Sequence, residues 1–494
     1  MNALSRILAW PPAANDDVPL ALWDADALAE ATGGEPSALF AVSGIEIDSR
    51  DVVAGDLFFA LKGETTDGHR FVDMAMAKGG AAAVTDRAVA GAHVQVADTT
   101  VALVALGRAS RQRSQAVIIG VTGSVGKTGV KEALFAALDR ASRGPGGFGA
   151  HRSLKSYNNH VGVPLSLARM PARSKFGIFE MGMNQAGEIA ALTRQVRPHI
   201  AVITAIAPAH IENLGSEEAI ADAKGEIFEG LEASDGTPGG TAIIPADSPH
   251  FARLKAKAER HGAKVVCFGR ADHADVRLLD AVPAADGGSL VTADMGDRRL
   301  CYTVAEPGDH WVINSLAVIA AVRAAGADLG AAGLALAEMT GLAGRGARIE
   351  IAAEGGPALL IDESYNANPA SMRATLAQLG RTPARRRIAV LGAMKELGSH
   401  GPGYHAALAG PIIEAGVDYA ILVGDEMADL AGELGKAGGD ALGKTLPHAH
   451  CQSMAEAQAA LQAYGLQRGD AILVKGSNSV GLGALVAALS GKQG

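Results

Sequence analysis

Residues 116–128, AVIIGVTGSVGKT, decide how the rest of the chain is interpreted. The apolar run at 117–121 has the length of a buried strand, and it ends in a turn that contains Gly123 and Gly126. After Thr128, apolar residues recur at three- and four-residue spacing, which is typical of one buried helix face. A strand, a glycine-rich turn and a helix that opens with Lys-Thr form the context of a phosphate-binding loop.

The chemistry of such a loop comes from its backbone. Small residues let successive N–H groups point at phosphate oxygens, and the start of the helix adds unpaired donors and a partial positive charge. Lys127 would reach the β- and γ-phosphates, and the Thr128 hydroxyl would coordinate Mg²⁺. The alternative, an ordinary glycine-rich connection, fits less well because the Gly-Lys-Thr order and both flanks match. The general pattern has glycine where this chain has Val121, and the glycine stands instead at Gly123. The predicted loop residues are Thr122, Gly123, Ser124, Val125, Gly126, Lys127 and Thr128.

Composition limits the class of protein. The chain has 494 residues, which suggests about three domains. A formal charge of −9 disfavours a dedicated nucleic-acid binder. The three cysteines are scattered without metal-ligand or disulfide spacing, so we expect a reducing cytoplasm. Neither a signal peptide nor a membrane-spanning run of about 20 apolar residues is expected, and we expect a monomer.

Alternating strand and helix patterns predict an α/β fold of three domains. A smaller α/β domain is expected over 1–112, with a strand at 45–50. A central domain over 113–338 would hold a doubly wound parallel sheet of the phosphate-loop ATPase type, and residues 339–494 would form a Rossmann-like α/β domain.

Two polar side chains follow predicted strands of the central domain. Glu180 ends the run at 176–179, and His210 follows the run at 200–206. Since ligands bind at the carboxyl ends of parallel strands, we expect both to face the phosphate loop. A carboxylate beside a triphosphate is repelled unless a cation lies between them, so Glu180 is predicted to bind Mg²⁺ directly or through water. Lys224 alone would be interpreted as a surface lysine of a helix.

Two further segments carry candidate ligand groups. His310 and Asn314 are four residues apart, so in a helix they share one face and could stack on and hydrogen-bond a purine. A satisfied histidine at a helix start fits equally well. The polar segment at 362–369 follows the first predicted strand of the third domain.

These motifs together resemble the Mur ligases, most closely the members that add D-alanyl-D-alanine. The motifs that carry the resemblance are DSR at 48–50, DLFFALKGE at 56–64, DGH at 67–69, TGSVGKT at 122–128, YNNHVGVP at 157–164, FEMGM at 179–183, AHIENLGS at 209–216, KGEIF at 224–228, GDHWVINSLA at 308–317, YNANPASM at 365–372 and KGSNS at 475–479. Each motif is weak alone except the phosphate loop, but their order and spacing together are strong, and they span nearly the whole chain.

The resemblance implies a role for each matching position. The first domain would bind a uridine nucleotide through Ser49 and Arg50, and Asn158 and Asn159 would lie along its sugar-peptide part. Thr128 and Glu180 would bind one Mg²⁺ and His210 a second, with Lys224 carbamylated as a further metal ligand. His310 and Asn314 would contact adenine, and Asp362, Tyr365 and Asn366 would close over ATP. The catalytic set would be Lys127, Glu180, His210 and Lys224.

The implied activity is an ATP-dependent, ADP-forming ligation in peptidoglycan precursor synthesis. UDP-N-acetylmuramoyl-tripeptide would be activated as an acyl phosphate and joined to D-alanyl-D-alanine. Alternatives are a Mur-type ligase that adds the third amino acid, a folylpolyglutamate-synthetase-like enzyme and a non-catalytic nucleotide-binding protein. Two positions depart from the family pattern: Ala393 stands where aspartate is usual, and Gly129 where threonine or serine is usual.

Overall fold

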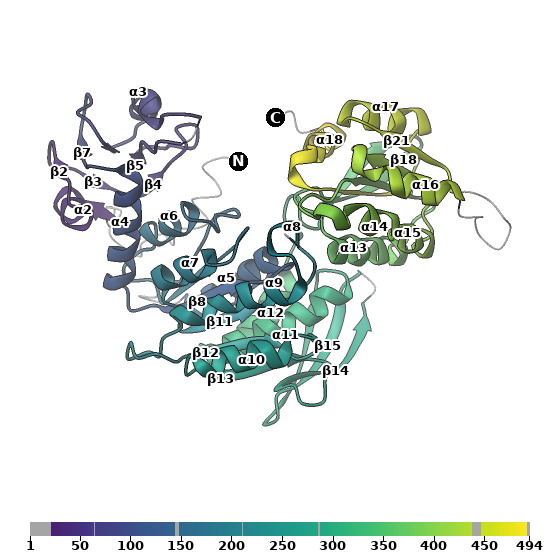
Figure 1. The fold of residues 1–494 in the computed structure, drawn as a ribbon, viewed down its shortest axis with the longest axis horizontal. Coiled ribbons are helices and arrows are strands. Elements are labelled where there is room, and N and C mark those ends of the chain that lie inside the picture. The colour runs from purple at the N-terminus through teal and green to yellow at the C-terminus, as the bar shows by residue number, and fades with distance from the viewer. Residues whose placement is uncertain are drawn as a thin grey trace.

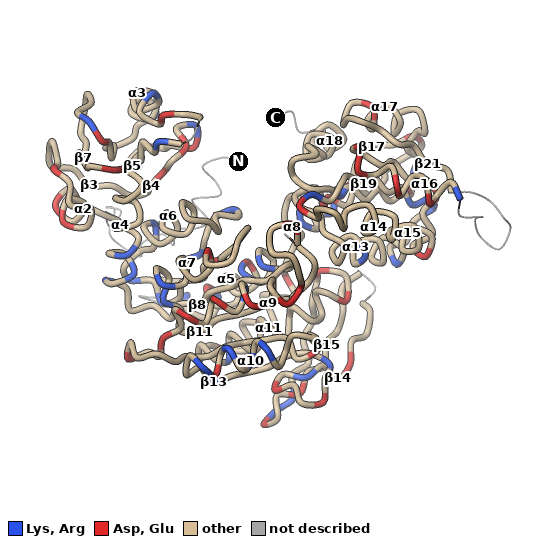
Figure 2. Tube along the Cα trace, viewed as in Figure 1, with Lys and Arg blue, Asp and Glu red and all other residues tan. Residues whose placement is uncertain are grey.

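The described residues form three units joined in sequence, each built on one main sheet. The computed structural model describes residues 21–63, 65–143, 148–209, 211–284, 287–436 and 446–491. The purple N-terminal unit and the green-to-yellow C-terminal unit stand on opposite sides of the teal central unit (Figure 1). Lys and Arg are intermixed with Asp and Glu over all three units, so each unit carries charges of both signs (Figure 2).

The first unit is built on a five-stranded sheet in the order β2-β7-β6-β5-β4, beside the pair β1-β3. Its strands are β1 (Trp23–Asp24), β2 (Glu35–Pro36), β3 (Ala41–Val42), β4 (Gly44–Glu46), β5 (Asp56–Phe59), β6 (Ala82–Thr85) and β7 (His93–Gln95). Its helices are α2 (Ala25–Thr32), η1 (Gly68–Phe71), α3 (Val72–Ala77) and α4 (Thr99–Arg113). The Asp98 side chain caps α4 by accepting hydrogen bonds from the N–H groups of Thr100 and Val101. α4 leads into the central unit.

The described residues of the central unit form a sheet of nine strands in the order β16-β15-β14-β13-β12-β11-β8-β10-β9. The strands are β8 (Val117–Thr122), β9 (Ala150–Arg152), β10 (Phe176–Glu180), β11 (Ile200–Ile203), β12 (Thr241–Pro245), β13 (Lys264–Gly269), β14 (Val276–Pro283), β15 (Ser289–Asp294) and β16 (Arg299–Val304). β8 to β14 are parallel, and β15 and β16 join antiparallel. Strands that follow β8 in the sequence lie on both of its sides, with β10 and β9 on one and β11 to β16 on the other. Ligands bind at such a switch point in sheets of this kind.

Helices cover both faces of this sheet. They are α5 (Lys127–Ser142), α6 (Gly162–Ala168), α7 (Glu188–Val196), α8 (Ile211–Leu214), α9 (Glu217–Gly225), η2 (Glu226–Gly230), α10 (Phe251–Arg260), α11 (Asp309–Ala324) and α12 (Leu329–Glu338). Alternate residues of β8 enter different cores: Ile119 packs in the cluster with α5, α11 and α12, and Ile118 in the cluster with α6, α7 and α9. This alternation is the period of a strand buried on both faces.

In the C-terminal unit, the described residues form six strands in the order β17-β18-β22-β19-β20-β21. The strands are β17 (Ala347–Ala353), β18 (Gly356–Glu363), β19 (Arg387–Gly392), β20 (Tyr419–Val423), β21 (His448–Cys451) and β22 (Ala471–Lys475). The helices are α13 (Pro369–Arg381), η3 (Gly398–His400), α14 (Gly401–Ala406), α15 (Ala409–Glu414), η4 (Asp425–Met427), α16 (Ala428–Lys436), α17 (Met454–Tyr464), η5 (Asn478–Val480) and α18 (Leu482–Leu489). β17 pairs antiparallel with β18, and the other neighbouring strands in this order pair parallel. One hydrophobic cluster continues from the central unit into this one, with Ile211 and Leu397 among its members.

The predicted α/β class and the three-unit organisation are confirmed, and each sheet lies inside one of the ranges 1–112, 113–338 and 339–494. The boundaries themselves stay a prediction. The prediction of a strand over 45–50 was wrong beyond Glu46, where β4 ends. The Asp48 side chain accepts a hydrogen bond from the N–H of Arg50, and the chain turns there. Within the described residues, no helix is both long and apolar enough to cross a membrane.

Candidate active site

The phosphate loop lies at the carboxyl end of β8. Gly126 has φ of 82°, a left-handed conformation that glycine adopts without strain, and α5 begins directly after it at Lys127. The Lys127 Nζ donates to the Gly123 carbonyl at 2.8 Å. The loop is anchored by Ser124, whose hydroxyl donates to the Ala207 carbonyl at 2.9 Å. These contacts leave the start of α5 facing a pocket.

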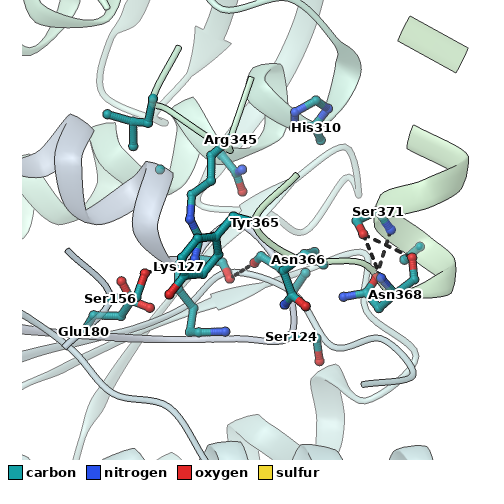
Figure 3. A pocket seen from close by; sticks show the side chains of 18 of the residues that line it. Ser124, Lys127, Ser156, Glu180, His310, Arg345, Tyr365, Asn366, Asn368 and Ser371 are labelled. Atoms are coloured by element: carbon teal, nitrogen blue, oxygen red, sulfur yellow. Dashed lines mark hydrogen bonds between the residues drawn. The ribbon is translucent and has the colours of Figure 1, made fainter. Parts of the chain in front are cut away.

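That pocket has a volume of about 610 Å³, within the range of ligand sites. It is lined by residues from the phosphate loop after β8, from β10, α9 and α11, and from the C-terminal unit, so five distant parts of the chain converge on it. The predicted site residues among its lining are Ser124, Val125, Gly126, Lys127, Asn158, Asn159, Glu180, Lys224, His310, Asn314, Tyr365 and Asn366. In the view of Figure 3, Lys127 and Tyr365 overlap at the centre, with Glu180 to their left and Asn366 to their right.

Glu180 is fully buried at the end of β10, where it pairs in register with Val121. Its Oε2 accepts the Thr128 hydroxyl at 2.9 Å, and its Oε1 accepts the Asn158 amide at 2.9 Å. Residue 128 lies just outside the lining itself, but the hydrogen bond brings its hydroxyl to the carboxylate. The expected meeting of Thr128 with Glu180 at neighbouring strand ends is therefore observed.

Lys224 lies in α9 and is only 1% exposed, so the default interpretation as a surface lysine is wrong. Burial holds the pKa of its amine well below the ordinary value, and the charge of Lys127 lowers the pKa further. This shift in pKa favours the uncharged, nucleophilic form of the amine. His210 lies outside the described residues.

A divalent cation is compatible with this chemistry. The buried Glu180 carboxylate and the Thr128 hydroxyl are hard oxygen donors at the loop that would hold phosphates. Mg²⁺ is commonly bound by one or two carboxylates together with substrate phosphates and water. Among the described residues, His, Cys, Asp and Glu form no group of three that could bind a metal alone. Phosphate oxygens would therefore have to complete the coordination.

His310 and Asn314 occupy the first turns of α11 and both line the pocket. Burial lowers the pKa of His310 to about 4, and the charge of Lys475 acts in the same direction. His310 is therefore neutral near pH 7. The Asn314 amide lies against Gly126, since a Cβ at 126 would be 2.9 Å from Asn314 Nδ2.

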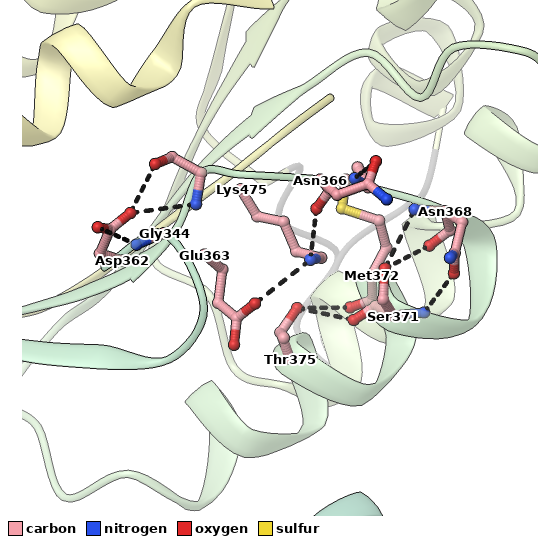
Figure 4. Close-up of polar contacts among 11 residues, drawn as sticks. Gly344, Asp362, Glu363, Asn366, Asn368, Ser371, Met372, Thr375 and Lys475 are labelled. Carbon is pink, nitrogen blue, oxygen red and sulfur yellow. Dashed lines mark hydrogen bonds and ion pairs between the residues drawn. The ribbon is translucent and has the colours of Figure 1, made fainter. Parts of the chain in front are cut away.

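The other predicted residues lie elsewhere. Asp362 is buried and supports the connection between the units: its carboxylate accepts the Gly344 N–H at 2.6 Å and the Ser364 hydroxyl at 2.6 Å (Figure 4). Ser49 and Arg50 are in the first unit, outside the pocket lining, and Arg50 pairs with Asp48 at 2.7 Å. Thr122 and Gly123 precede the lining residues of the loop.

Sequence reasoning gave no role to two cations of this pocket. Arg345 donates to the Ser156 hydroxyl at 3.1 Å, and its guanidinium lies 4.1 Å from the centre of the Tyr365 ring (Figure 3). Lys475 donates to the Asn366 carbonyl at 2.9 Å and lies 3.5 Å from Glu363 (Figure 4). The only signals were Gly-Arg-Gly at 344–346 and Lys-Gly-Ser at 475–477.

Comparison with known proteins places this geometry in a family. The descriptions "Mur ligase family, catalytic domain", "Mur ligase middle domain" and "Mur ligase, glutamate ligase domain" match residues 41–121, 121–322 and 347–478. A UDP-N-acetylmuramoyl-tripeptide–D-alanyl-D-alanine ligase of Synechocystis sp. is 36% identical over 91% of this chain and 92% of its own. The chain belongs to the Mur ligase family.

Other Mur ligases support this placement. A ligase of the same name from Mycobacterium tuberculosis is 31% identical, covering 90% of this chain and 91% of its own. A crystal structure of MurF from Acinetobacter baumannii matches with a TM-score of 0.78 at 30% identity, covering 96% of this chain and all of that one (100%). MurF ligase from Thermotoga maritima in complex with ADP shares the fold, with a TM-score of 0.71 at 24% identity, covering 91% and 98% of the two chains. The resemblance seen in the motifs, to MurF-like Mur ligases, is confirmed.

Proposed function

We propose that this Mur ligase is an ATP-dependent, ADP-forming enzyme that joins D-alanyl-D-alanine to UDP-N-acetylmuramoyl-tripeptide in peptidoglycan precursor synthesis. The observation that carries the proposal is the similarity, over nearly the whole chain, to curated ligases with that name. The pocket supports it, because a phosphate loop, a buried carboxylate and groups from the C-terminal unit surround one space.

The reaction must turn a poor leaving group into a good one. A peptide carboxylate oxygen attacks the γ-phosphorus of ATP, the bond to the β-phosphate oxygen breaks, and ADP leaves. The amine of D-alanyl-D-alanine then attacks the carbonyl carbon of the acyl phosphate, inorganic phosphate leaves, and the amine's extra proton passes to solvent. Two anions meet in the first step, so cations around the phosphates are needed.

The chain provides these cations. Lys127 begins α5 at the phosphate loop, and Arg345 and Lys475 enter the same pocket from the linker and the C-terminal unit. Glu180 and Thr128 would hold Mg²⁺, which when bound supplies further positive charge to the transferring phosphoryl group. His210 would hold a second ion, and carbamylated Lys224 would add a carboxylate to this site.

The remaining roles follow from position. His310 and Asn314 would contact adenine, and Tyr365 and Asn366 would cover ATP from the C-terminal unit, with Asp362 holding their segment. Asn158 and Asn159 would lie along the sugar-peptide substrate, whose uridine end Ser49 and Arg50 would bind. Enclosing the three substrates between units would exclude water and protect the acyl phosphate from hydrolysis. We also propose that the enzyme is cytoplasmic and monomeric.

A substrate-omission assay tests the proposal. Phosphate release is expected only when ATP, UDP-N-acetylmuramoyl-tripeptide and D-alanyl-D-alanine are all present. Phosphate release that does not depend on the UDP-linked tripeptide would refute the proposal, and turnover with a single amino acid in place of the dipeptide would favour another Mur-type ligase. Lys127→Ala is expected to abolish release. Near-normal turnover of that variant would remove the phosphate loop from the mechanism.

A further inference from the structure

The glycine at position 129 has a structural cause. Gly129 is the third residue of α5, and its φ is not in the left-handed region, so backbone freedom does not explain it. Glycine in a helix costs about 1 kcal/mol relative to alanine. A Cβ at this position would lie 2.8 Å from Cη2 and 2.9 Å from Cζ2 of Trp311, closer than real Cβ contacts. The indole therefore occupies the space that a side chain at 129 would need.

Trp311 belongs to the wall of the pocket as well as to the core. It lies in the first turn of α11, next to His310, with the two ring centres 6.4 Å apart and tilted by 44°. It packs against the hydrophobic cluster between α5 and α11, and it also lines the pocket with Lys127 and Asn314. The remaining side of the indole thus faces the space in front of the phosphate loop.

The position of this wall limits what it can contact. Phosphates held by the loop and by the first N–H groups of α5 leave the nucleoside to extend away from that helix end. Gly129 is in this first turn, and Trp311 lies directly against it. With neutral His310 beside it, the wall is aromatic and uncharged, which suits a ribose or base better than a phosphate. Aromatic rings contribute about 1–3 kcal/mol when they stack on a base.

We propose that Trp311 is a nucleotide-binding residue whose indole contacts the nucleoside part of ATP, and that glycine at 129 is what allows the indole to lie there. The inference rests on the proposed use of ATP and adds to it a residue pair that explains the departure at 129. It predicts that the two positions are coupled in stability and that Trp311 distinguishes a nucleotide from bare phosphates.

The affinity of the full-length chain for ADP with Mg²⁺, measured by calorimetry, tests the contact. Trp311→Ala is expected to weaken ADP binding about tenfold, which corresponds to about 1.4 kcal/mol, within the range for an aromatic–base contact. Competition by inorganic tripolyphosphate, which lacks a nucleoside, should change less than twofold. An equal loss for both ligands, or no loss for ADP, overturns the inference. A wild-type chain that does not bind ADP overturns the proposed function together with it.

Intrinsic fluorescence gives a second readout that does not depend on truncating the side chain. The sequence contains Trp10, Trp23 and Trp311, and Trp23 is buried in the first unit. We expect ADP to change the emission of the wild type, and this change to be absent in Trp311→Phe, which keeps an aromatic ring. The same ADP-dependent change in both proteins would contradict the contact.

A double-mutant cycle tests the role of glycine. Gly129→Ala should lower the melting temperature although alanine favours helices, because its methyl group would meet the indole. In a Trp311→Ala background the same substitution should leave the melting temperature unchanged or raise it. Equal effects of Gly129→Ala in both backgrounds would show that the two positions are not coupled, and would overturn this half of the inference.

Discussion

Lys131 is a buried lysine that no motif singled out. It lies one turn after Lys127 in α5 with no exposed surface. Its ammonium donates to the Lys155 carbonyl at 2.7 Å and lies 3.2 Å from Glu132 and 3.9 Å from Glu180. Burial lowers the pKa of Lys131, and the two carboxylates act against that shift. Lys131→Met removes the charge and keeps the length of the side chain.

The expected loss can be worked from these contacts. A hydrogen bond to a charged donor contributes about 1.5–3 kcal/mol. Removing one member of a buried ion pair costs about 3–5 kcal/mol, but Glu132 keeps Arg152 at 2.7 Å as a partner. Lys131→Met also removes the cost of burying an ammonium group, and this gain offsets part of the lost free energy. We therefore expect a destabilisation of about 2 kcal/mol, which lowers the melting temperature by about 4–8 °C for a unit of this size.

The chain offers a matched control on its surface. Lys255 in α10 is half exposed, and its ion pair with Glu259 at 3.9 Å is worth little in water. Lys255→Met should lower the melting temperature by less than about 1 °C, given about 0.3 kcal/mol for such a pair. Scanning calorimetry of both variants measures the two shifts in melting temperature. Equal shifts would refute the stabilising role of the buried Lys131 contacts. Since Lys131 holds the segment that carries Asn158, the KM for the UDP-linked substrate should also rise in Lys131→Met alone.

Three other predictions concern pH, metal and lysine chemistry. Burial raises the pKa of Glu306 from 4.5 to about 7, with nearby Arg348 opposing and Glu363 adding to the shift. As pH rises, the Glu306 carboxyl therefore loses its proton in the unfolded chain before it does so in the folded chain, and the free energy of unfolding falls between about pH 4.5 and 7. Glu306→Gln should raise the melting temperature at pH 8 and have little effect at pH 4. Excess EDTA should stop phosphate release and added Mg²⁺ restore it, whereas full activity in EDTA would exclude the predicted ion. With ¹³C-bicarbonate, NMR should detect a carbamate carbon that Lys224→Arg abolishes; an identical signal in the variant would place the carbamate elsewhere.

The local pattern of the sequence was sufficient for the phosphate loop. A buried strand, glycine at the left-handed position 126 and an amphipathic helix depend on contacts within about 25 residues, so periodicity and residue type identify them. The same reasoning placed Glu180 at a strand end, and the parallel register of β8 and β10 brings it to Thr128.

Other features depended on contacts that the sequence does not encode locally. Nothing in the spacing shows that the indole of residue 311 lies on Gly129, that Lys131 is buried, or that Arg345 joins Ser156 to Tyr365. Each contact joins segments from different strands, helices or units, and it exists only once the order of strands and the packing of units are set.

The sequence by itself therefore determined the phosphate loop, the α/β class and the family, because these depend on short-range pattern and on the order of motifs. The tertiary structure decided which charges share the pocket, since burial and distance between remote residues determine their pKa values and partners. It also gave a reason for glycine at 129, because only the packing of α11 against α5 leaves no room there for a side chain.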